Sequence, residues 1–127
     1  IKNVNLSVSP FIPKPHSDFE REGMEGLEIL KEKQRRLSSG LQAKGSRIKA
    51  NFHSSETARI EGALARGDKN TGKVILKAWE KGLRLQAWTE HFNYNLWDQA
   101  FQETGIDAEI YLKKKEKEEF LPWGFIR

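Results

Sequence analysis

Cysteine is missing from this sequence, and methionine occurs once in its 127 residues. Without cysteine, the chain forms no disulfide and offers neither a thiolate nucleophile nor a cysteine ligand for zinc or an iron–sulfur cluster. Histidine is also scarce. His16, His53 and His91 stand far apart, and none has a partner at the spacing that places two ligands on one helix face. We therefore predict no metal site within these residues.

Several familiar motifs are missing too. The chain contains no phosphate-binding GxxxxGK loop, no GxGxxG turn and no GxSxG nucleophile elbow, which excludes the common nucleotide-binding and hydrolase sites. No apolar run approaches the ~20 residues that cross a bilayer, and the first residues lack the layout of a signal peptide. We therefore expect a cytoplasmic protein with no membrane partner.

The composition is that of one folded domain or part of one. Hydrophobic residues make up 37% of the chain and charged residues 31%, so a core can form, while the length leaves little room for a second domain. The net charge of +4 permits a nucleic-acid partner without singling one out. Because the chain begins with isoleucine inside a strand-like pattern, we expect a fragment of a longer protein.

Two short strands are predicted. Apolar residues alternate with asparagine and serine over residues 3–9, and a similar alternation covers residues 47–52. One strand is not stable alone, and the sequence identifies no partner for the second. After the first strand, Pro10, Pro13 and Pro15 hold the chain extended, which predicts a stiff loop.

Helical periodicity accounts for most of the remaining chain. Apolar steps of three and four residues, with Ser17 or Asp18 as the cap, predict a helix over residues 18–43. Similar stripes, each ended by a glycine, predict three further helices: residues 55–67, 71–81 and 96–104. Asn95 is expected to cap the last of these, and Asp107 to start a short final helix. The fold class is therefore a helix-rich α+β fold.

The tryptophans and the charged run near the C-terminus allow more than one interpretation. Four tryptophans among basic residues would suit stacking platforms for single-stranded nucleic acid. Core packing is favoured because Trp79 and Trp97 fall on the apolar stripes of their predicted helices. The run at residues 113–119 mixes lysine and glutamate at helical spacing, which indicates a solvated helix face rather than a binding tail.

Four segments carry a resemblance to a known family. They read SVSPFIPKPH at residues 7–16, EGALARGD at 61–68, WTEHF at 88–92 and LPW at 121–123. In this order they resemble the C-terminal region of a bacterial family of cobalamin-binding-domain radical S-adenosylmethionine (radical SAM) proteins, over nearly the whole chain. The sequence departs from the family pattern at Asp18 and Glu20, where proline and glutamine are expected, and at Gly124, where an acidic residue is expected.

The resemblance implies an incomplete α/β barrel. In such a parent protein three cysteines hold a [4Fe-4S] cluster, and S-adenosylmethionine is cleaved reductively to give a carbon-centred radical; the use of cobalamin is left open. None of those cysteines is present here, so this chain alone is expected to bind no cofactor and to be non-catalytic. The implied domains are residues 1–20, the last strand and active-site-side loop of the barrel, and residues 21–127, a helical C-terminal region.

The same interpretation singles out residues on the first strand and its loop. Asn5, Ser7 and Ser9 would face the barrel interior. The loop leaves the carboxyl end of the strand, where α/β barrels place their chemistry, so Lys14 and His16 are the candidates to face substrate or cofactor. Lys14 would neutralise a carboxylate or phosphate, and His16 would donate to one or shuttle a proton. The alternative is that the motif only fixes a turn.

Arg66, Asp68, Glu90 and His91 are secondary candidates. For the first two we favour a structural role, in which Arg66 favours the negative end of a helix closed by Gly67 and Asp68 caps the next helix. For the other two we favour an interior, hydrogen-bonded histidine over an acid–base pair, because adjacent residues usually point apart.

Two other functions stay open beside the enzyme fragment, whose partner would be the remainder of the parent protein. One is a non-catalytic module that docks RNA, a ribosomal particle or a protein, and steep salt dependence would identify nucleic-acid binding. The other is a purely structural cap on the barrel, which would unfold or aggregate alone because its strand edges are unpaired.

Overall fold

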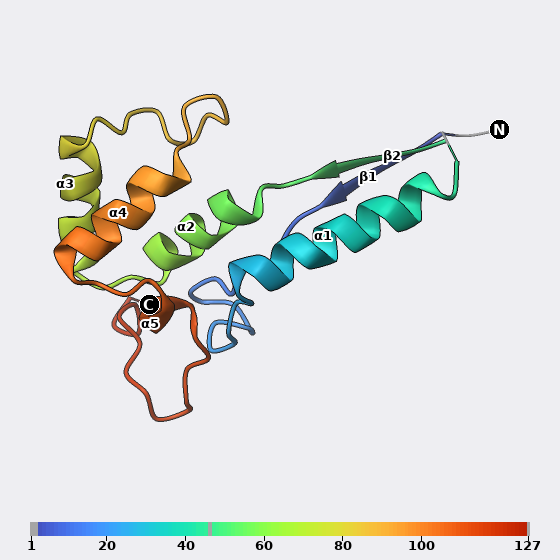
Figure 1. Cartoon of the computed structure of the whole chain (residues 1–127). Helices are drawn as coiled ribbons and strands as arrows, with labels where there is room; N and C mark the ends of the chain where they lie inside the picture. Colours follow the sequence, from blue (N-terminus) through green and yellow to red (C-terminus); the bar gives the residue numbers. More distant parts are fainter. Residues whose placement is uncertain (1–2, 46, 127) are drawn as a thin grey trace.

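The computed structural model describes residues 3–45 and 47–126. Its elements follow in the order β1 (Val4–Val8), α1 (Leu27–Gln42), β2 (Ile48–Phe52), α2 (Ser55–Ala65), α3 (Thr71–Glu80), α4 (Tyr94–Thr104) and α5 (Glu109–Leu112). The predicted helix-rich α+β fold is confirmed (Figure 1). The predicted domains, residues 1–20 and 21–127, include four residues outside the described ones: 1, 2, 46 and 127.

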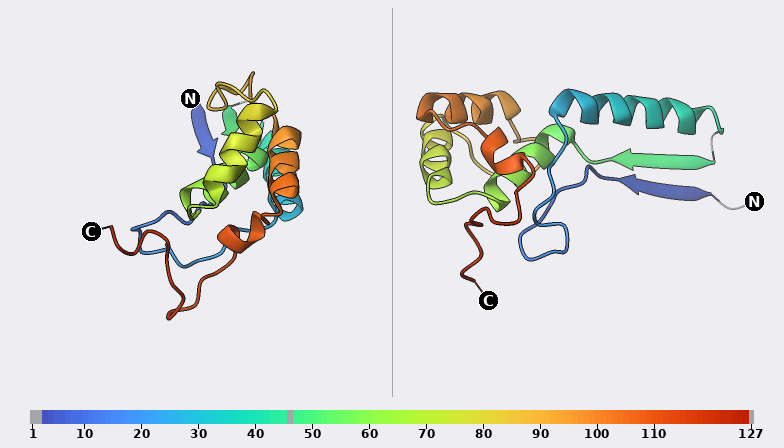
Figure 2. Two further views of the ribbon diagram at one scale, coloured as in Figure 1. Left: turned by 90° about the vertical axis from the view of Figure 1, so that its left-hand side faces the viewer. Right: turned by 90° about the horizontal axis from the view of Figure 1, so that it is seen from below.

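The elements β1, α1 and β2 form a unit that projects from the rest of the molecule, which we call the arm (Figure 1). The two strands pair in parallel, with Val4 opposite Ile48 and Val8 opposite Phe52. The helix α1 lies beside the strands and contacts β2 (Figure 2). The partner of the second strand, which the sequence did not identify, is therefore β1.

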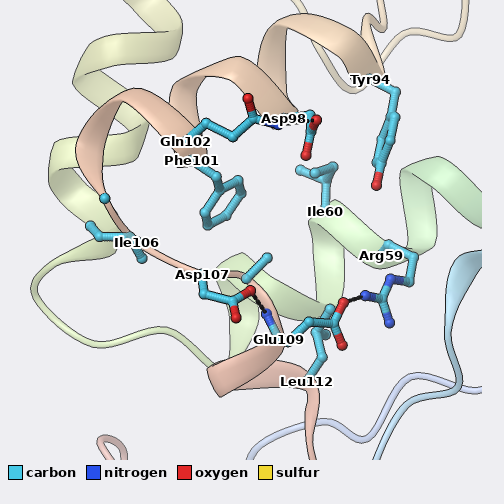
Figure 3. Close-up of a pocket in the computed structure, with 12 residues that line it drawn as sticks. Arg59, Ile60, Tyr94, Asp98, Phe101, Gln102, Ile106, Asp107, Glu109 and Leu112 are labelled. Atoms are coloured by element: carbon cyan, nitrogen blue, oxygen red, sulfur yellow. Dashed lines mark hydrogen bonds and ion pairs between the residues drawn. The ribbon is translucent and has the colours of Figure 1, made fainter.

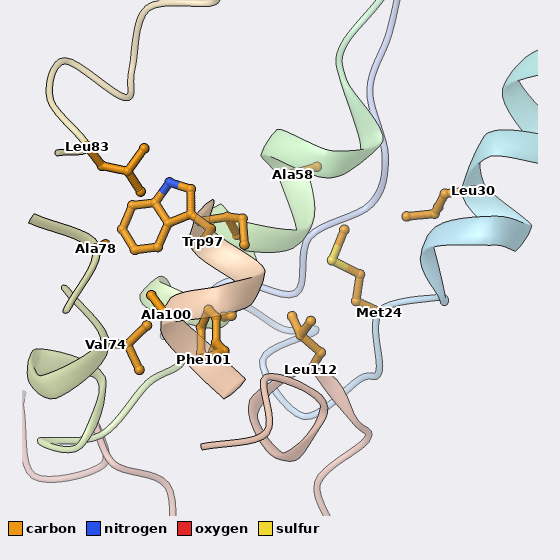
Figure 4. Close-up of a cluster of buried hydrophobic side chains, with 12 residues drawn as sticks. Met24, Leu30, Ala58, Val74, Ala78, Leu83, Trp97, Ala100, Phe101 and Leu112 are labelled. Atoms are coloured by element: carbon orange, nitrogen blue, oxygen red, sulfur yellow. The ribbon is translucent and has the colours of Figure 1, made fainter. Parts of the chain in front are cut away.

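The helices α2 to α5 and the C-terminal segment form the helical body. Within it α2 contacts α4 and α5, and α3 packs against α4. The buried core contains side chains from all these helices, together with Met24 from the loop before α1 and Leu30 from α1 (Figure 4). Its members are Met24, Leu30, Ala58, Ile60, Ala63, Val74, Ala78, Leu83, Trp97, Ala100, Phe101 and Leu112. No helix within residues 3–45 and 47–126 is long and apolar enough to cross a membrane.

The predicted helix over residues 18–43 is shorter than expected, since α1 begins at Leu27. The chain before it runs through turns and passes close to the C-terminal segment. A Cβ added to Gly23 would lie 2.9 Å from the backbone nitrogen of Lys114. Because of this close approach and the low helix propensity of Gly23 and Gly26, the chain before Leu27 is not helical, although its apolar residues have helical spacing.

The later helices are confirmed with shifts at their ends. The helix α4 is capped by Asn93, whose side chain accepts a hydrogen bond from the Leu96 backbone N–H at 3.1 Å; the predicted cap, Asn95, lies inside the helix. The short helix expected after Asp107 is present as α5.

The charged run at residues 113–119 is mostly solvated, as predicted, with five of its seven residues exposed, but it is not helical. Lys115 within it is buried. The ammonium group of Lys115 donates to the Ile110 carbonyl at 2.8 Å and to Glu119 Oε1 at 3.0 Å, and its backbone N–H donates to the Arg21 carbonyl at 2.7 Å. The run therefore packs against the chain that precedes α1.

The core prediction is confirmed for Trp97 and wrong for Trp79. Trp97 is 6% exposed, whereas Trp79 is 56% exposed. The buried stripe of α3 consists of Thr71, Val74 and Ala78. Trp79 lies about 100° further round the helix than Ala78, so it falls outside the stripe that α4 covers.

Candidate functional site

The candidate site lies where the arm meets the helical body. Both strands point their carboxyl ends toward this junction (Figure 1). The loop of residues 9–26 leaves β1 there, and β2 leads into α2. The His53 backbone N–H donates to the Val8 carbonyl at 2.8 Å, which continues the strand pairing to the junction. Ligands of open α/β sheets bind outside the carboxyl ends of their parallel strands, so a ligand site is expected at this junction.

The sheet that leads to the junction has an uncovered polar face. Asn5 and Ser7 of β1 are exposed, as are their paired residues Lys49 and Asn51 of β2. The alternate residues, Leu6 among them, are mostly half-buried. The structure thus brings Asn5 and Ser7 together on one open face, in line with their predicted positions.

Ser9 lies at the end of this face and borders a hollow. The hollow has a volume of about 420 Å³, and its walls include Phe11, Leu30 and Leu37. These walls come from the loop and from α1. An apolar hollow therefore opens beside the carboxyl end of β1.

Lys14 is engaged by a partner from α2. Its ammonium group forms an ion pair with Glu61, and both side chains are about half exposed. The ion pair joins the loop to residues 61–68, the second of the four segments that resemble the family. A carboxylate or phosphate ligand would have to compete with Glu61 for this cation.

The backbone at His16 is held in the left-handed region, with φ of 60°. Its N–H donates to Glu20 Oε2 at 2.9 Å, and the indole N–H of Trp123 donates to the same oxygen at 2.7 Å. These two hydrogen bonds lower the pKa of the Glu20 carboxyl below its usual range, and the one from Trp123 has the larger effect. The imidazole of His16 stays exposed at the surface of this anchored turn.

Arg66 is the central residue of the junction. Its side chain is fully buried and donates only to backbone carbonyls: Tyr111 at 2.7 Å, Glu22 at 2.8 Å, Lys113 at 3.1 Å and Pro13 at 3.3 Å. Burial lowers the pKa of Arg66, but a guanidinium stays protonated in proteins. The buried charge is therefore compensated by carbonyl dipoles from the loop and the C-terminal segment.

Arg66 is the C-cap residue of α2, so its predicted position at the end of a helix is confirmed. Its guanidinium also lies 5.9 Å from the Trp123 ring and joins the loop to the C-terminal segment, which the sequence did not indicate. Three of the four family-like segments therefore meet at this one side chain: the loop after β1, the end of α2 and the segment that contains Trp123.

Asp68 stabilises the turn before α3, but the predicted cap is wrong, because the N-cap residue of α3 is Asn70. Its Oδ1 accepts hydrogen bonds from the Asn70 backbone N–H at 2.8 Å and the Tyr111 hydroxyl at 2.9 Å. Burial raises the pKa of Asp68, but these hydrogen bonds outweigh burial and leave that pKa below its usual value. Burial and the hydrogen bond to Asp68 raise the pKa of Tyr111 to about 12. Asp68 thus acts as a structural carboxylate.

Glu90 and His91 lie away from the junction, in the loop between α3 and α4. Both are exposed, so the predicted interior histidine is wrong. The His91 ring lies 6.0 Å from the Trp88 ring, and its backbone carbonyl accepts from Gln86 at 2.6 Å. The loop is thus held by its backbone, which leaves these side chains pointing outward.

A second hollow of about 410 Å³ lies between α2, α4 and α5 (Figure 3). Arg59 on its wall is buried, donates to the Glu25 carbonyl at 2.9 Å and forms an ion pair with Glu109. Burial lowers the pKa of Arg59 and raises that of Tyr94 across the hollow. Because the arginine is already neutralised by Glu109, we do not assign a catalytic role to this hollow.

No group of three metal-ligating side chains suited to a metal ion occurs in the part of the chain that the structure describes. The candidate site therefore consists of a polar sheet face, an apolar hollow and an anchored loop that presents His16. Sequence reasoning missed Glu20 as an anchoring group, and it placed Arg66 at the end of a helix without identifying the carbonyl groups that its guanidinium binds. Backbone carbonyls are available at every position, so nothing in the sequence marks them as partners for Arg66.

Comparison with known proteins finds a protein that is similar to part of this chain. The chain is 40% identical over 76 residues to an uncharacterized protein of Methanocaldococcus jannaschii, and the match covers 59% of this chain. The chain spans only 16% of the length of that protein. No family model matches the sequence, and no solved structure matches it.

Proposed function

We propose that this chain is the C-terminal part of a radical SAM enzyme, in which β1 and β2 belong to an incomplete α/β barrel. The observation that carries the proposal is the uncovered polar face of the parallel sheet. Parallel sheets are normally covered on both faces, and a two-stranded sheet is marginally stable alone. A barrel accounts for both features, because a neighbouring strand would pair with the open edge and the polar face would line the lumen.

Two further observations support this proposal. The segments that resemble the family at residues 7–16, 61–68 and 121–123 meet at Arg66 in three dimensions, as parts of one site would. The relative from Methanocaldococcus jannaschii is a much longer protein, of which the chain covers 16%. A region of this kind therefore occurs within a larger protein.

The residues of this chain do not fit an iron–sulfur cluster, because they include no cysteine. The [4Fe-4S] cluster and the reductive cleavage of S-adenosylmethionine would belong to another part of the protein, as would any cobalamin. We assign to this chain the positioning of a loop at the mouth of the barrel.

In this role, Asn5, Ser7 and Ser9 supply hydrogen-bonding groups along the lumen. His16 presents its imidazole from a turn that Glu20 fixes, so it is the residue of the loop best placed to bind substrate or transfer a proton. Lys14 provides a cation whose position is set by Glu61.

The first test is the coding sequence upstream of Ile1, read together with the intact mass of the native protein. We expect a CxxxCxxC cysteine triad upstream. The full-length protein, reconstituted without oxygen with iron and sulfide, should convert S-adenosylmethionine to 5′-deoxyadenosine when a reductant is added. A native start immediately before Ile1, or a full-length protein that binds no cluster, would overturn the proposal.

The role of the loop has its own test. His16→Ala should lower turnover of substrate at least tenfold, by loss of a positioned hydrogen bond or proton donor. His91→Ala changes an equally exposed histidine in the distant loop and should leave turnover unchanged. Equal effects of the two substitutions would contradict a special role for His16.

A further inference from the structure

The outer side of α3 and the loop that follows it expose an unusual set of large apolar side chains. We call this surface the aromatic-basic face. Its apolar members are Ile75, Leu76, Trp79, Leu85 and Trp88, each between 48% and 58% exposed. Because Trp79 and Trp88 are both more than half exposed, their indole rings contribute little to the core of the body.

Trp79 carries a cation on one side of its ring. The Arg84 guanidinium lies 4.5 Å from the ring centroid. Its Nη1 donates to the carbonyls of Trp79 and Leu83, both at 2.7 Å. The planar guanidinium is thus fixed on the indole before any ligand arrives, which reduces the entropy lost on binding.

Trp88 is displayed by an ordered loop. Gln86 donates to the carbonyls of Arg84 at 2.9 Å and His91 at 2.6 Å. Its Oε1 accepts from the indole N–H of the buried Trp97 at 3.1 Å. The loop is therefore anchored to the core, and its exposed indole has a defined position.

The face also concentrates positive charge. Residues 69–92 contain five Lys or Arg and two Glu, a net charge of +3, out of +4 for the whole chain. Lys77 and Lys81 form ion pairs with glutamates. Among the described residues, Lys69 and Lys73 form no ion pair, and Arg84 only stacks on Trp79 and binds carbonyls. Three cations thus remain available to an anion.

We propose that the aromatic-basic face binds single-stranded nucleic acid. Bases stack on the Trp79–Arg84 pair and on Trp88, while Lys69 and Lys73 contact phosphates. Exposed aromatic rings interleaved with cations are the arrangement that non-specific single-strand binding uses. The inference does not rest on the barrel proposal, because the whole face lies within the helical body.

The test is a titration of the full-length protein into a fluorescein-labelled 12-nucleotide oligouridylate, followed by fluorescence anisotropy. With about two phosphate contacts, the affinity should fall roughly sevenfold between 50 and 200 mM salt. Trp79→Ala and Trp88→Ala should each weaken binding about tenfold through loss of base stacking. Lys73→Glu should weaken it as well and should flatten the salt dependence.

Phe120→Ala is the matched control, because Phe120 is 78% exposed and lies outside the face. It should leave the affinity unchanged. The proposal is overturned by absence of binding at 50 mM salt, by equal losses for the control and the tryptophan variants, or by affinity independent of salt. It is also overturned if Trp79→Ala abolishes self-association in sedimentation experiments but leaves oligouridylate binding intact, since the face would then bind protein.

Discussion

The arm and the helical body differ in how completely they bury their side chains. In the body, Val74 and Ala100 are fully buried and Leu112 nearly so, and even Arg66 has all its contacts inside the molecule. In the arm, β1 has no fully buried residue, and only Leu30 is buried in α1. Since burial of apolar surface is the main source of stability, the body can hold its shape by internal contacts. The arm has a regular backbone but far fewer buried side chains to stabilise it.

Substitution of Arg66 should have the largest effect on the body. Arg66→Ala removes the donor for four backbone carbonyls in a buried setting, so we expect a loss of about 4 kcal/mol of unfolding free energy. Hydrogen exchange of the full-length protein should show the loop before α1 and the segment after α5 opening together. Arg36→Ala, on the exposed side of α1, should change stability by less than about 0.5 kcal/mol. Independent opening of the two segments would contradict the assigned role of Arg66.

A charge on the open face of the arm tests whether that face is covered in the full-length protein. Ser7→Lys creates no clash with the described residues, because Ser7 is exposed. If the face lines a barrel, an unpaired lysine there should cost about 3 kcal/mol. Thermal unfolding of the full-length protein measures this loss. Ser39→Lys, also at an exposed serine of the arm, serves as control, and equal melting temperatures for the two variants would argue against a barrel.

Substitution of two glycines by alanine tests how tightly two parts of the body are packed. A Cβ at Gly62 would lie 2.9 Å from a Leu112 methyl carbon and 3.2 Å from the Met24 sulfur, so Gly62→Ala should destabilise by about 2 kcal/mol. At Gly72, near the start of α3, no atom lies within 4 Å of an added Cβ. Gly72→Ala should therefore stabilise by about 0.5 kcal/mol through higher helix propensity. Urea unfolding of both variants should give changes of opposite sign.

An alkaline effect tests a single hydrogen bond of the body, that between Tyr111 and Asp68. Folding raises the pKa of Tyr111 to about 12, above its unfolded value of about 10. The protonated hydroxyl is thus favoured by the folded state. Its contribution should be complete below pH 10 and should disappear as the pH rises through about 12.

The measurement is the unfolding free energy of wild type and Tyr111→Phe between pH 9 and 12.5. The advantage of the wild type, about 1 kcal/mol, should shrink across this range. Tyr94→Phe provides the comparison, because it removes the other tyrosine hydroxyl and leaves the hydrogen bond from Tyr111 to Asp68 in place. A constant difference between wild type and Tyr111→Phe would show that Tyr111 does not titrate as expected.

Local patterns predicted most of the elements because they depend on near neighbours in sequence. The alternation in β1 and β2 and the apolar stripe of α3 at Val74 and Ala78 are confirmed. The start of α1 was missed because its apolar spacing continues through residues that contact the C-terminal segment. Trp79 was misplaced because the width of a buried stripe depends on how much of the helix the neighbour covers.

For the candidate site, the sequence indicated the strand face and the loop but not what holds them. Asn5 and Ser7 lie on one open face as expected, whereas Lys14 was found in an ion pair with Glu61 and His91 was found exposed. The contact between Trp123 and Glu20 joins residues at opposite ends of the chain. No short-range pattern contains such a contact.

The sequence alone specifies most of the secondary structure, the absence of cysteine chemistry and the concentration of positive charge between residues 69 and 92. These properties follow from composition and from periodicities of two and about 3.6 residues, which need no knowledge of distant contacts. Only the tertiary structure decided that Arg66 joins three segments and that Trp79 and Trp88 face outward. Both depend on which surfaces distant elements cover, because burial and hydrogen-bond partners are set by the packing of the whole chain.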